Sequence, residues 1–154
     1  MSLLENTMIH SMVASATGLA NLESSQILDM DGYDGVMWVG TISGNTNTTG
    51  GYATLIHMHG DSSGSMVGST ASTDMYVSNA TTDEGALNNQ VLVLDVYRPL
   101  KRYVSVTAGK DSTNAVEMGV IGIQYKSRTG PITQLGSTET YGVYASSLEI
   151  SPTT

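Results

Sequence analysis

Two histidines and an aspartate lie close together in one apolar stretch of the sequence. His57 and His59 are two positions apart in the run 52–59, which has the composition of a β-strand, and Asp61 follows directly. Because alternate side chains of a strand point to the same face, both imidazoles would project together and could bind zinc with the carboxylate. A structural zinc site normally needs a fourth ligand, and His10 is the only other histidine. The pattern therefore favours polar side chains on a solvent or subunit face over a metal site.

A second group of possible ligands is formed by three aspartates, Asp29, Asp31 and Asp34. Their spacing resembles the start of a calcium loop, which needs an oxygen-bearing ligand at its fifth position and glutamate at its twelfth. Those two positions hold Tyr33 and Gly40, so the pattern fails at both. The favoured interpretation is a turn built from aspartate and glycine that leads into a strand, and a calcium site of another type is the alternative.

No other catalytic arrangement stands out. The sequence contains no glycine-rich phosphate loop, no HExxH motif and no nucleophile elbow, and it has no cysteine. Serine and threonine are so abundant that any serine–histidine–aspartate grouping could be drawn by chance. We therefore expect no enzymatic activity and no cofactor.

The composition indicates a single β-rich domain. The chain has 154 residues, only 13% of them charged, with one tryptophan and no phenylalanine. Such a chain, rich in threonine, valine, glycine and asparagine, favours strands joined by many turns. No apolar run approaches the 18 residues of a membrane span, and the N-terminus does not have the pattern of a signal peptide, so we expect a soluble protein. A net charge of −8 makes nucleic acid a poor partner.

The charges are distributed unevenly along the chain. Residues 1–97 carry ten acidic residues and no basic one, whereas all the basic residues fall between positions 98 and 128. Two interpretations are open: the basic stretch could contact an acidic surface on another molecule or copy, or it could face the acidic strands inside one subunit. The basic residues are Arg98, Lys101, Arg102, Lys110, Lys126 and Arg128.

Alternation of apolar residues and turn signals predicts six or seven short strands, which is typical of a β-sandwich or barrel. The expected strands cover 36–42, 52–59, 74–78, 90–97, 101–108, 115–125 and a segment around 141–148. The first two are expected to form a hairpin with a long loop. The run 90–97 has apolar residues on both faces, as expected for a strand inside a sandwich.

The first 28 residues show no clean period. Ile9, Met12, Val13 and Ala16 have helical spacing, yet glycine, serine and threonine weaken it. We expect an N-terminal arm over residues 1–28, with at most one helical turn, and a sandwich domain over 29–154. The arm could reach across a neighbouring molecule, or it could be a frayed end.

Three segments resemble a family of small phage proteins. The residues Val91-Leu-Val-Leu-Asp-Val-Tyr-Arg-Pro-Leu-Lys-Arg-Tyr-Val-Ser-Val106, then 119–128 with Pro131, and the earlier 31–39 look like proteins encoded beside the major capsid gene of tailed bacteriophages. The resemblance implies a head-decoration, or cement, protein with a β-sandwich or jelly-roll fold. Such a protein is made in the host cytoplasm and sits on the outer capsid surface of the virion. Its partners would be the major capsid protein and its own copies, as a homodimer or homotrimer, without nucleic acid or membrane.

Under this resemblance, the basic stretch supplies candidates for the capsid-facing or inter-subunit surface. These are Arg98, Lys101, Arg102 and Arg128, together with Tyr97 and Tyr103. The alternative is a binding module of a phage fibre or adhesin that recognises cell-surface carbohydrate. Its stacking residues would be Tyr33, Trp38 and Tyr52, next to loops rich in glycine and asparagine.

Overall fold

The structure, a computed structural model, shows an all-β protein. It describes residues 6–16, 23–24, 26–45, 51–68, 76–81, 87–110 and 116–128. Within these ranges the chain forms ten strands and no helix. Among the described residues there is consequently no helix long and apolar enough to cross a membrane.

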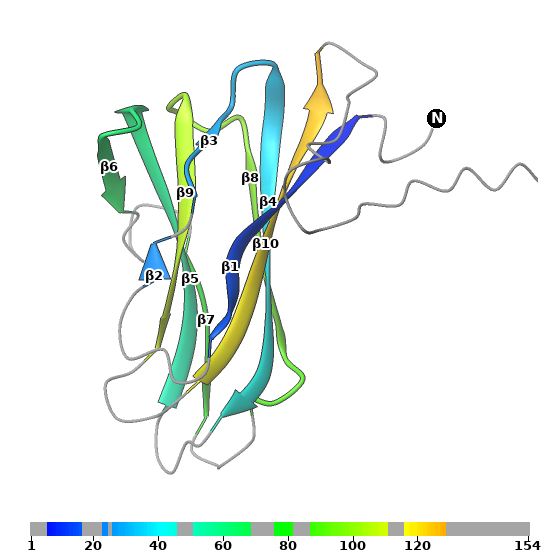
Figure 1. Ribbon diagram of the computed structural model, residues 1–154, viewed down its shortest axis with the longest axis vertical. Coiled ribbons are helices and arrows are strands. Elements are labelled where there is room, and N and C mark those ends of the chain that lie inside the picture. The colour runs from blue at the N-terminus through cyan, green and yellow to red at the C-terminus, as the bar shows by residue number, and fades with distance from the viewer. Residues whose placement is uncertain are drawn as a thin grey trace, which may run out of the picture.

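The strands form two antiparallel sheets that pack against each other as a β-sandwich (Figure 1). Sheet A has four strands in the order β1 (Thr7–Ala16), β10 (Val116–Ser127), β4 (Tyr33–Asn45) and β8 (Val91–Tyr97). Sheet B has the order β2 (Glu23–Ser24), β9 (Tyr103–Lys110), β5 (Gly51–Ser62) and β6 (Ser65–Gly68), while β3 (Leu28–Asp29) also pairs with β9 and β7 (Tyr76–Thr81) with β5. The predicted fold class, an all-β sandwich, is confirmed.

The core lies between the sheets and is built from alternate residues of each strand. On β9, Val104, Val106 and Ala108 face inward and are fully buried. Trp38 of β4 faces them from sheet A and is also fully buried. Its indole Nε1–H donates a hydrogen bond to Nδ1 of His57, 3.2 Å away on the opposite sheet. The single tryptophan therefore both fills the centre and links the two layers.

Consecutive strands mostly change sheet rather than pair with each other. The chain runs from β1 in sheet A to β2 and β3 in sheet B, to β4 in A, to β5, β6 and β7 in B, and then to β8, β9 and β10 in A, B and A. The predicted hairpin of 36–42 with 52–59 is therefore wrong, because these runs lie in β4 and β5 of different sheets. β4 pairs instead with β10 and β8.

The first strand corrects the prediction of an N-terminal arm. Residues Thr7–Ala16 form β1, which pairs with β10 in sheet A, and short strands β2 and β3 follow before residue 29. The register between β1 and β10 shifts on either side of Val13. Each such irregularity breaks the period of two along a strand. The sequence therefore showed no clean alternation over a segment that is nevertheless a strand.

Most of the other predicted strands are confirmed within longer elements. β4, β5, β8, β9 and β10 contain the greater part of their expected runs, and β7 begins two residues later than the start expected for its run. The strand expected around 141–148 lies outside the described residues.

Candidate interaction surfaces

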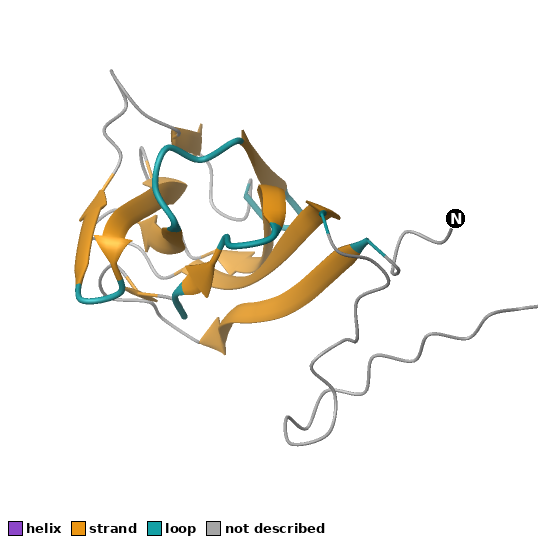
Figure 2. Ribbon diagram, turned by 90° about the horizontal axis from the view of Figure 1, so that it is seen from above, coloured by secondary structure: helices purple, strands orange, loops and turns teal. Residues whose placement is uncertain are grey.

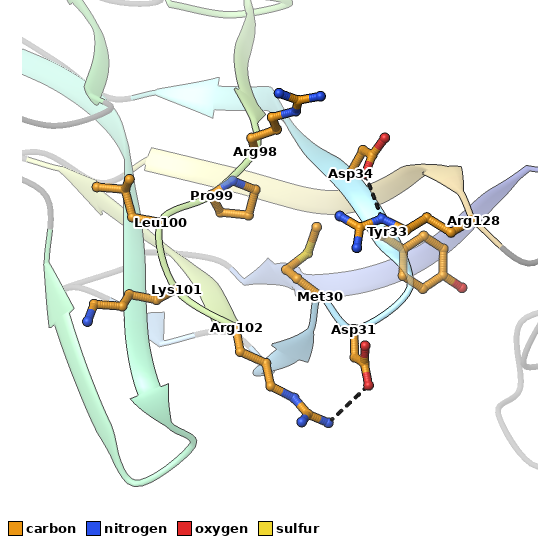
Figure 3. A pocket seen from close by; sticks show the side chains of 10 residues that line it. All are labelled: Met30, Asp31, Tyr33, Asp34, Arg98, Pro99, Leu100, Lys101, Arg102 and Arg128. Carbon is orange, nitrogen blue, oxygen red and sulfur yellow. Dashed lines mark hydrogen bonds and ion pairs between the residues drawn. The ribbon is translucent and has the colours of Figure 1, made fainter.

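The predicted basic residues gather at one end of the sandwich, here called the charged end. The turn before β4, the loop from β8 to β9 and the last residues of β10 meet there, at the end that faces the viewer in Figure 2. They surround an open pocket of about 420 Å³ (Figure 3). Its lining consists of Met30, Asp31, Tyr33, Asp34, Arg98, Pro99, Leu100, Lys101, Arg102 and Arg128.

Three bases of the charged end form ion pairs with acids from the first part of the chain. Arg102 binds both carboxylate oxygens of Asp29, with N–O distances of 2.8 and 2.7 Å. Lys101 contacts Asp61 at 2.7 Å, and the closest contact between Arg128 and Asp34 is 2.9 Å. For these bases the interpretation of pairing inside one subunit is confirmed.

The ion pairs shape the loops more than they stabilise the fold. Arg102 and Asp29 are 54% and 42% exposed, so water and salt screen their attraction and the pair contributes little to stability. The hydrogen bonds from Arg102 nevertheless lower the pKa of the Asp29 carboxyl. Arg102 holds the loop from β8 to β9 against β3, and Lys101 holds the same loop against the end of β5. Arg128 joins the end of β10 to the start of β4, so the main effect of the pairs is geometric.

The loop from β8 to β9 presents an apolar side chain to solvent. Its backbone is fixed at both ends: the N–H of Arg98 donates to the carbonyl of Asp34 at 2.7 Å, and the carbonyl of Arg102 accepts from the N–H of Met30 at 2.8 Å. Arg98 adopts a left-handed conformation with φ of 53°. Between these anchors, Leu100 is 87% exposed. The loop therefore holds a leucine outward on a well-fixed backbone.

A buried glutamine connects the charged end to the edge of sheet A. The side-chain amide of Gln124 donates to the carbonyl oxygen of Asp29 at 2.8 Å, and its oxygen accepts from Nε2 of His10 at 2.8 Å. Gln124 is almost fully buried. Burial lowers the pKa of His10, and the hydrogen bond with Gln124 only partly offsets this effect.

Protonation of His10 is expected to destabilise the fold as the pH falls below 6.5. The unfolded chain binds a proton there near the ordinary pKa of 6.5, whereas the folded chain binds it only at lower pH. The unfolded state then carries more protons, so stability is lost between 6.5 and the lowered pKa. The free energy of unfolding, measured with urea across this pH window, should depend less on pH for His10→Gln than for the wild type. Identical slopes would contradict this assignment.

The structure places the histidine pair on β5. His57 and His59 do share a face, as predicted, but it is the inner face of sheet B, where His57 is buried and bonded to Trp38. Asp61 instead binds Lys101. The prediction that this side chain lies on a face toward solvent or another subunit is therefore wrong for His57. In the part of the chain that the structure describes, no three histidine, cysteine, aspartate or glutamate side chains are grouped to hold a metal ion.

The aspartate segment forms the predicted turn. The Asp29 carboxylate accepts a hydrogen bond from the backbone N–H of Asp31 at 2.9 Å. The same carboxylate binds Arg102, and Asp34 binds Arg128. The three carboxylates are thus turned toward arginines, since Asp31 also lies 3.6 Å from Arg102.

A second surface covers the side of sheet A that faces away from the core, here called the outer face of sheet A. β8 alternates strictly between buried and exposed residues, and Val91, Val93 and Tyr97 are 55%, 49% and 49% exposed. The prediction that this run is buried on both faces is therefore wrong for the single subunit. β8 lies at the edge of sheet A, and the described residues leave its outer side chains accessible.

The two predicted tyrosines lie beside cations. Tyr97 is contacted by Arg98, whose guanidinium carbon is 5.2 Å from the ring centre, and by the Lys126 ammonium at 4.5 Å. Tyr103 is half-buried, with the Arg102 guanidinium carbon 5.5 Å from its ring centre. Tyr97 thus borders the outer face of sheet A, whereas Lys101, Arg102, Tyr103 and Arg128 belong to the charged end. Arg98 lies where the two surfaces meet, because it contacts Tyr97 and also lines the pocket.

The residues predicted for sugar stacking are not brought together. Trp38 is fully buried in the core. Tyr33 starts β4 at the charged end, where it pairs with Ser127, whereas Tyr52 starts β5 at the opposite end of the sandwich. These residues therefore form no shared platform for a carbohydrate.

Comparison with known proteins adds no assignment. No family model matches the sequence, and no curated protein matches it.

Proposed function

We propose that this protein is a structural component of a tailed-bacteriophage virion that decorates the outer capsid surface and cements it by binding across capsid subunits. In this proposal it has no catalytic role. Its function is to supply a rigid sandwich with surfaces that fit neighbouring proteins.

The observation that carries the proposal is Leu100. An apolar side chain that is 87% exposed on a fixed loop is arranged to enter a pocket on a partner. Because the loop is already ordered, binding loses little conformational entropy. The arginines and aspartates around it would form the polar rim that surrounds such an anchor.

Two further observations support the viral assignment. The segment 91–106, which resembles decoration proteins, contains both the loop and Leu100. The repeated change of sheet between consecutive strands supports the jelly-roll form of the sandwich, in which strands of two Greek keys are distributed over two sheets.

Replacing Leu100 with serine is expected to weaken attachment to the capsid roughly tenfold or more, because it removes the anchor. Purified particles of the phage that carries the gene should be stripped of this protein, incubated with the variant, and sedimented to measure the bound fraction. The matched control is Val67→Ser. Val67 is also well exposed, at 61%, and lies on β6 in sheet B, outside the loop that carries Leu100. Equal retention of the Leu100 variant and the control would refute the role of Leu100.

The copy number per particle tests the class of protein. A cement protein should be present on the head in hundreds of copies, similar to the capsid subunit, whereas a receptor-binding module should be present in few copies at a tail or fibre tip. Quantitative gel analysis of purified virions, with immunogold labelling, distinguishes these locations. Labelling confined to the tail would reject the proposal in favour of a carbohydrate-binding module.

A further inference from the structure

The outer face of sheet A is apolar across neighbouring strands. Along β8, β4 and β10 the register places outward-facing residues beside one another, so that Val93 lies next to Val39, and Val39 next to Ile121. Ile121 is 41% exposed, and Val39 is half-buried. The apolar members of this face include Val91, Val93, Tyr97, Met37, Val39, Ile121 and Ile123. Contiguous apolar surface of this kind marks interaction sites in soluble proteins.

The face is large enough for a stable contact between two subunits. Four strands at about 4.8 Å spacing and about seven residues in length give roughly 450 Å² of flat sheet. Protruding side chains raise the accessible area toward the ~800 Å² that each partner buries in a standard interface. Two sheets can pack face to face with about 10 Å between them, as in the sandwich itself.

The charges on this face have both signs, and among the described residues they are not neutralised within the subunit. Arg98 and Lys126 flank the Tyr97 ring, and the ion pairs among the described residues include neither of them. Asp95 lies on the same face of β8 and is likewise in none of those pairs. It accepts a hydrogen bond of 2.6 Å from the hydroxyl of Tyr125. In contrast, Lys101, Arg102 and Arg128 each form an ion pair with an aspartate of the same subunit.

A surface that carries both signs beside an apolar patch can be complementary to itself. In a two-fold contact the same patch meets its own copy, so each acid can approach the cation of the partner and each cation the acid. A partner with a uniformly acidic or basic surface would leave one sign opposed by its own kind. The distribution of charges on this face therefore favours a second copy over such partners.

We infer that the protein forms a two-fold dimer in which the outer faces of sheet A of two copies pack together, with Asp95 of each copy next to Lys126 and Arg98 of the other. This inference rests on the proposed structural role and names one of its partners. Leu100 is not part of this contact, although Arg98 belongs to the same loop, so a dimer could present two loops to the capsid and bind with avidity.

Analytical ultracentrifugation of the full chain, from about 1 to about 200 μM, tests the dimer. The wild type should dimerise. Val93→Lys should raise the dissociation constant of the dimer about a hundredfold or more, because the variant places an unpaired charge in the buried contact. The change should leave the fold intact, since Val93 is 49% exposed in the subunit, and circular dichroism checks this. Val67→Lys is the matched control and should dimerise like the wild type. A wild type that stays monomeric, or a Val93 variant that dimerises like the control, would overturn the inference.

Paired charge reversals test the arrangement of the two copies. Asp95→Lys alone and Lys126→Glu alone should each dimerise poorly, because each places like charges opposite one another. An equimolar mixture should form a mixed dimer at least tenfold more tightly than either variant alone, since the new lysine of one copy meets the new glutamate of the other. The loss of the bond between Tyr125 and Asp95 persists in the mixture, so recovery reports on the charges. No recovery would exclude this two-fold arrangement.

The two sets of experiments fail independently. The dimer is measured in solution without any capsid, and the capsid assay compares Leu100→Ser with Val67→Ser. If the wild type is monomeric but its attachment to the capsid still depends on Leu100, only the dimer inference is rejected. A dimer without head-associated copies would remove only the decoration role.

Discussion

Replacing Trp38 with alanine is expected to lower the free energy of unfolding by about 3–5 kcal/mol, the typical cost of emptying a large aromatic site in a core. Trp38 is fully buried, and its indole donates to His57 across the two sheets. A domain of this kind is stable by about 5–15 kcal/mol, so the loss is a large share of the total. Urea unfolding followed by far-ultraviolet circular dichroism measures it without relying on tryptophan fluorescence.

Two companion variants separate the contributions at this position. Trp38→Phe keeps most of the ring volume but removes the N–H donor, and it should cost about 1–3 kcal/mol. Val67→Ala, at a site 61% exposed, should change stability by less than about 0.5 kcal/mol. If Trp38→Ala cost no more than Val67→Ala, the indole would not be the centre of the core.

Gly122→Val is expected to destabilise the protein by about 1–3 kcal/mol or more, through overpacking. A Cβ atom added at Gly122 would lie 2.7 Å from Cζ3 of Trp38 and 3.1 Å from Cγ of Met12. Both neighbours are buried in the core and cannot move without disturbing other contacts. Denaturant midpoints of wild type and variant provide the measurement.

Gly64→Ala is the matched control for this position. Gly64 lies in the turn between β5 and β6, and a Cβ added there meets nothing within 4 Å. The control should unfold at almost the same urea concentration as the wild type. A Gly122 variant as stable as the Gly64 variant would show that the ring of Trp38 can shift at little cost.

The inner layers of the sandwich could be predicted where alternation is regular. Val104 and Val106 alternate with polar residues in the sequence, and β9 buries them as expected. β8 shows why the same reasoning can fail. Leu92, Leu94 and Val96 face the core, but Val91 and Val93 are equally apolar and face outward. Apolar residues on both faces of a strand therefore do not show by themselves that both faces are buried within one subunit.

Pairing between distant segments could not be predicted in the same way. The distribution of charge gave contact between basic and acidic segments as one of two interpretations. Nothing local indicates that Arg102 pairs with Asp29 or Lys101 with Asp61. These partners are fixed by the crossing of the chain between sheets. The same crossing places His57 opposite Trp38. Spacing along one strand correctly gave the shared face of His57 and His59, but it could not tell which face is the interior.

The position of β10 has a consequence for synthesis on the ribosome. β10 lies between β1 and β4 in sheet A, yet it is the last strand of the described chain to be made. β1 therefore has no partner until residues 116–127 have left the exit tunnel, and its pairing joins segments more than a hundred residues apart. Contacts between such distant segments slow folding, because a long loop must close before they can form. Until then, residues 7–16 are without the partner strand that they have in sheet A.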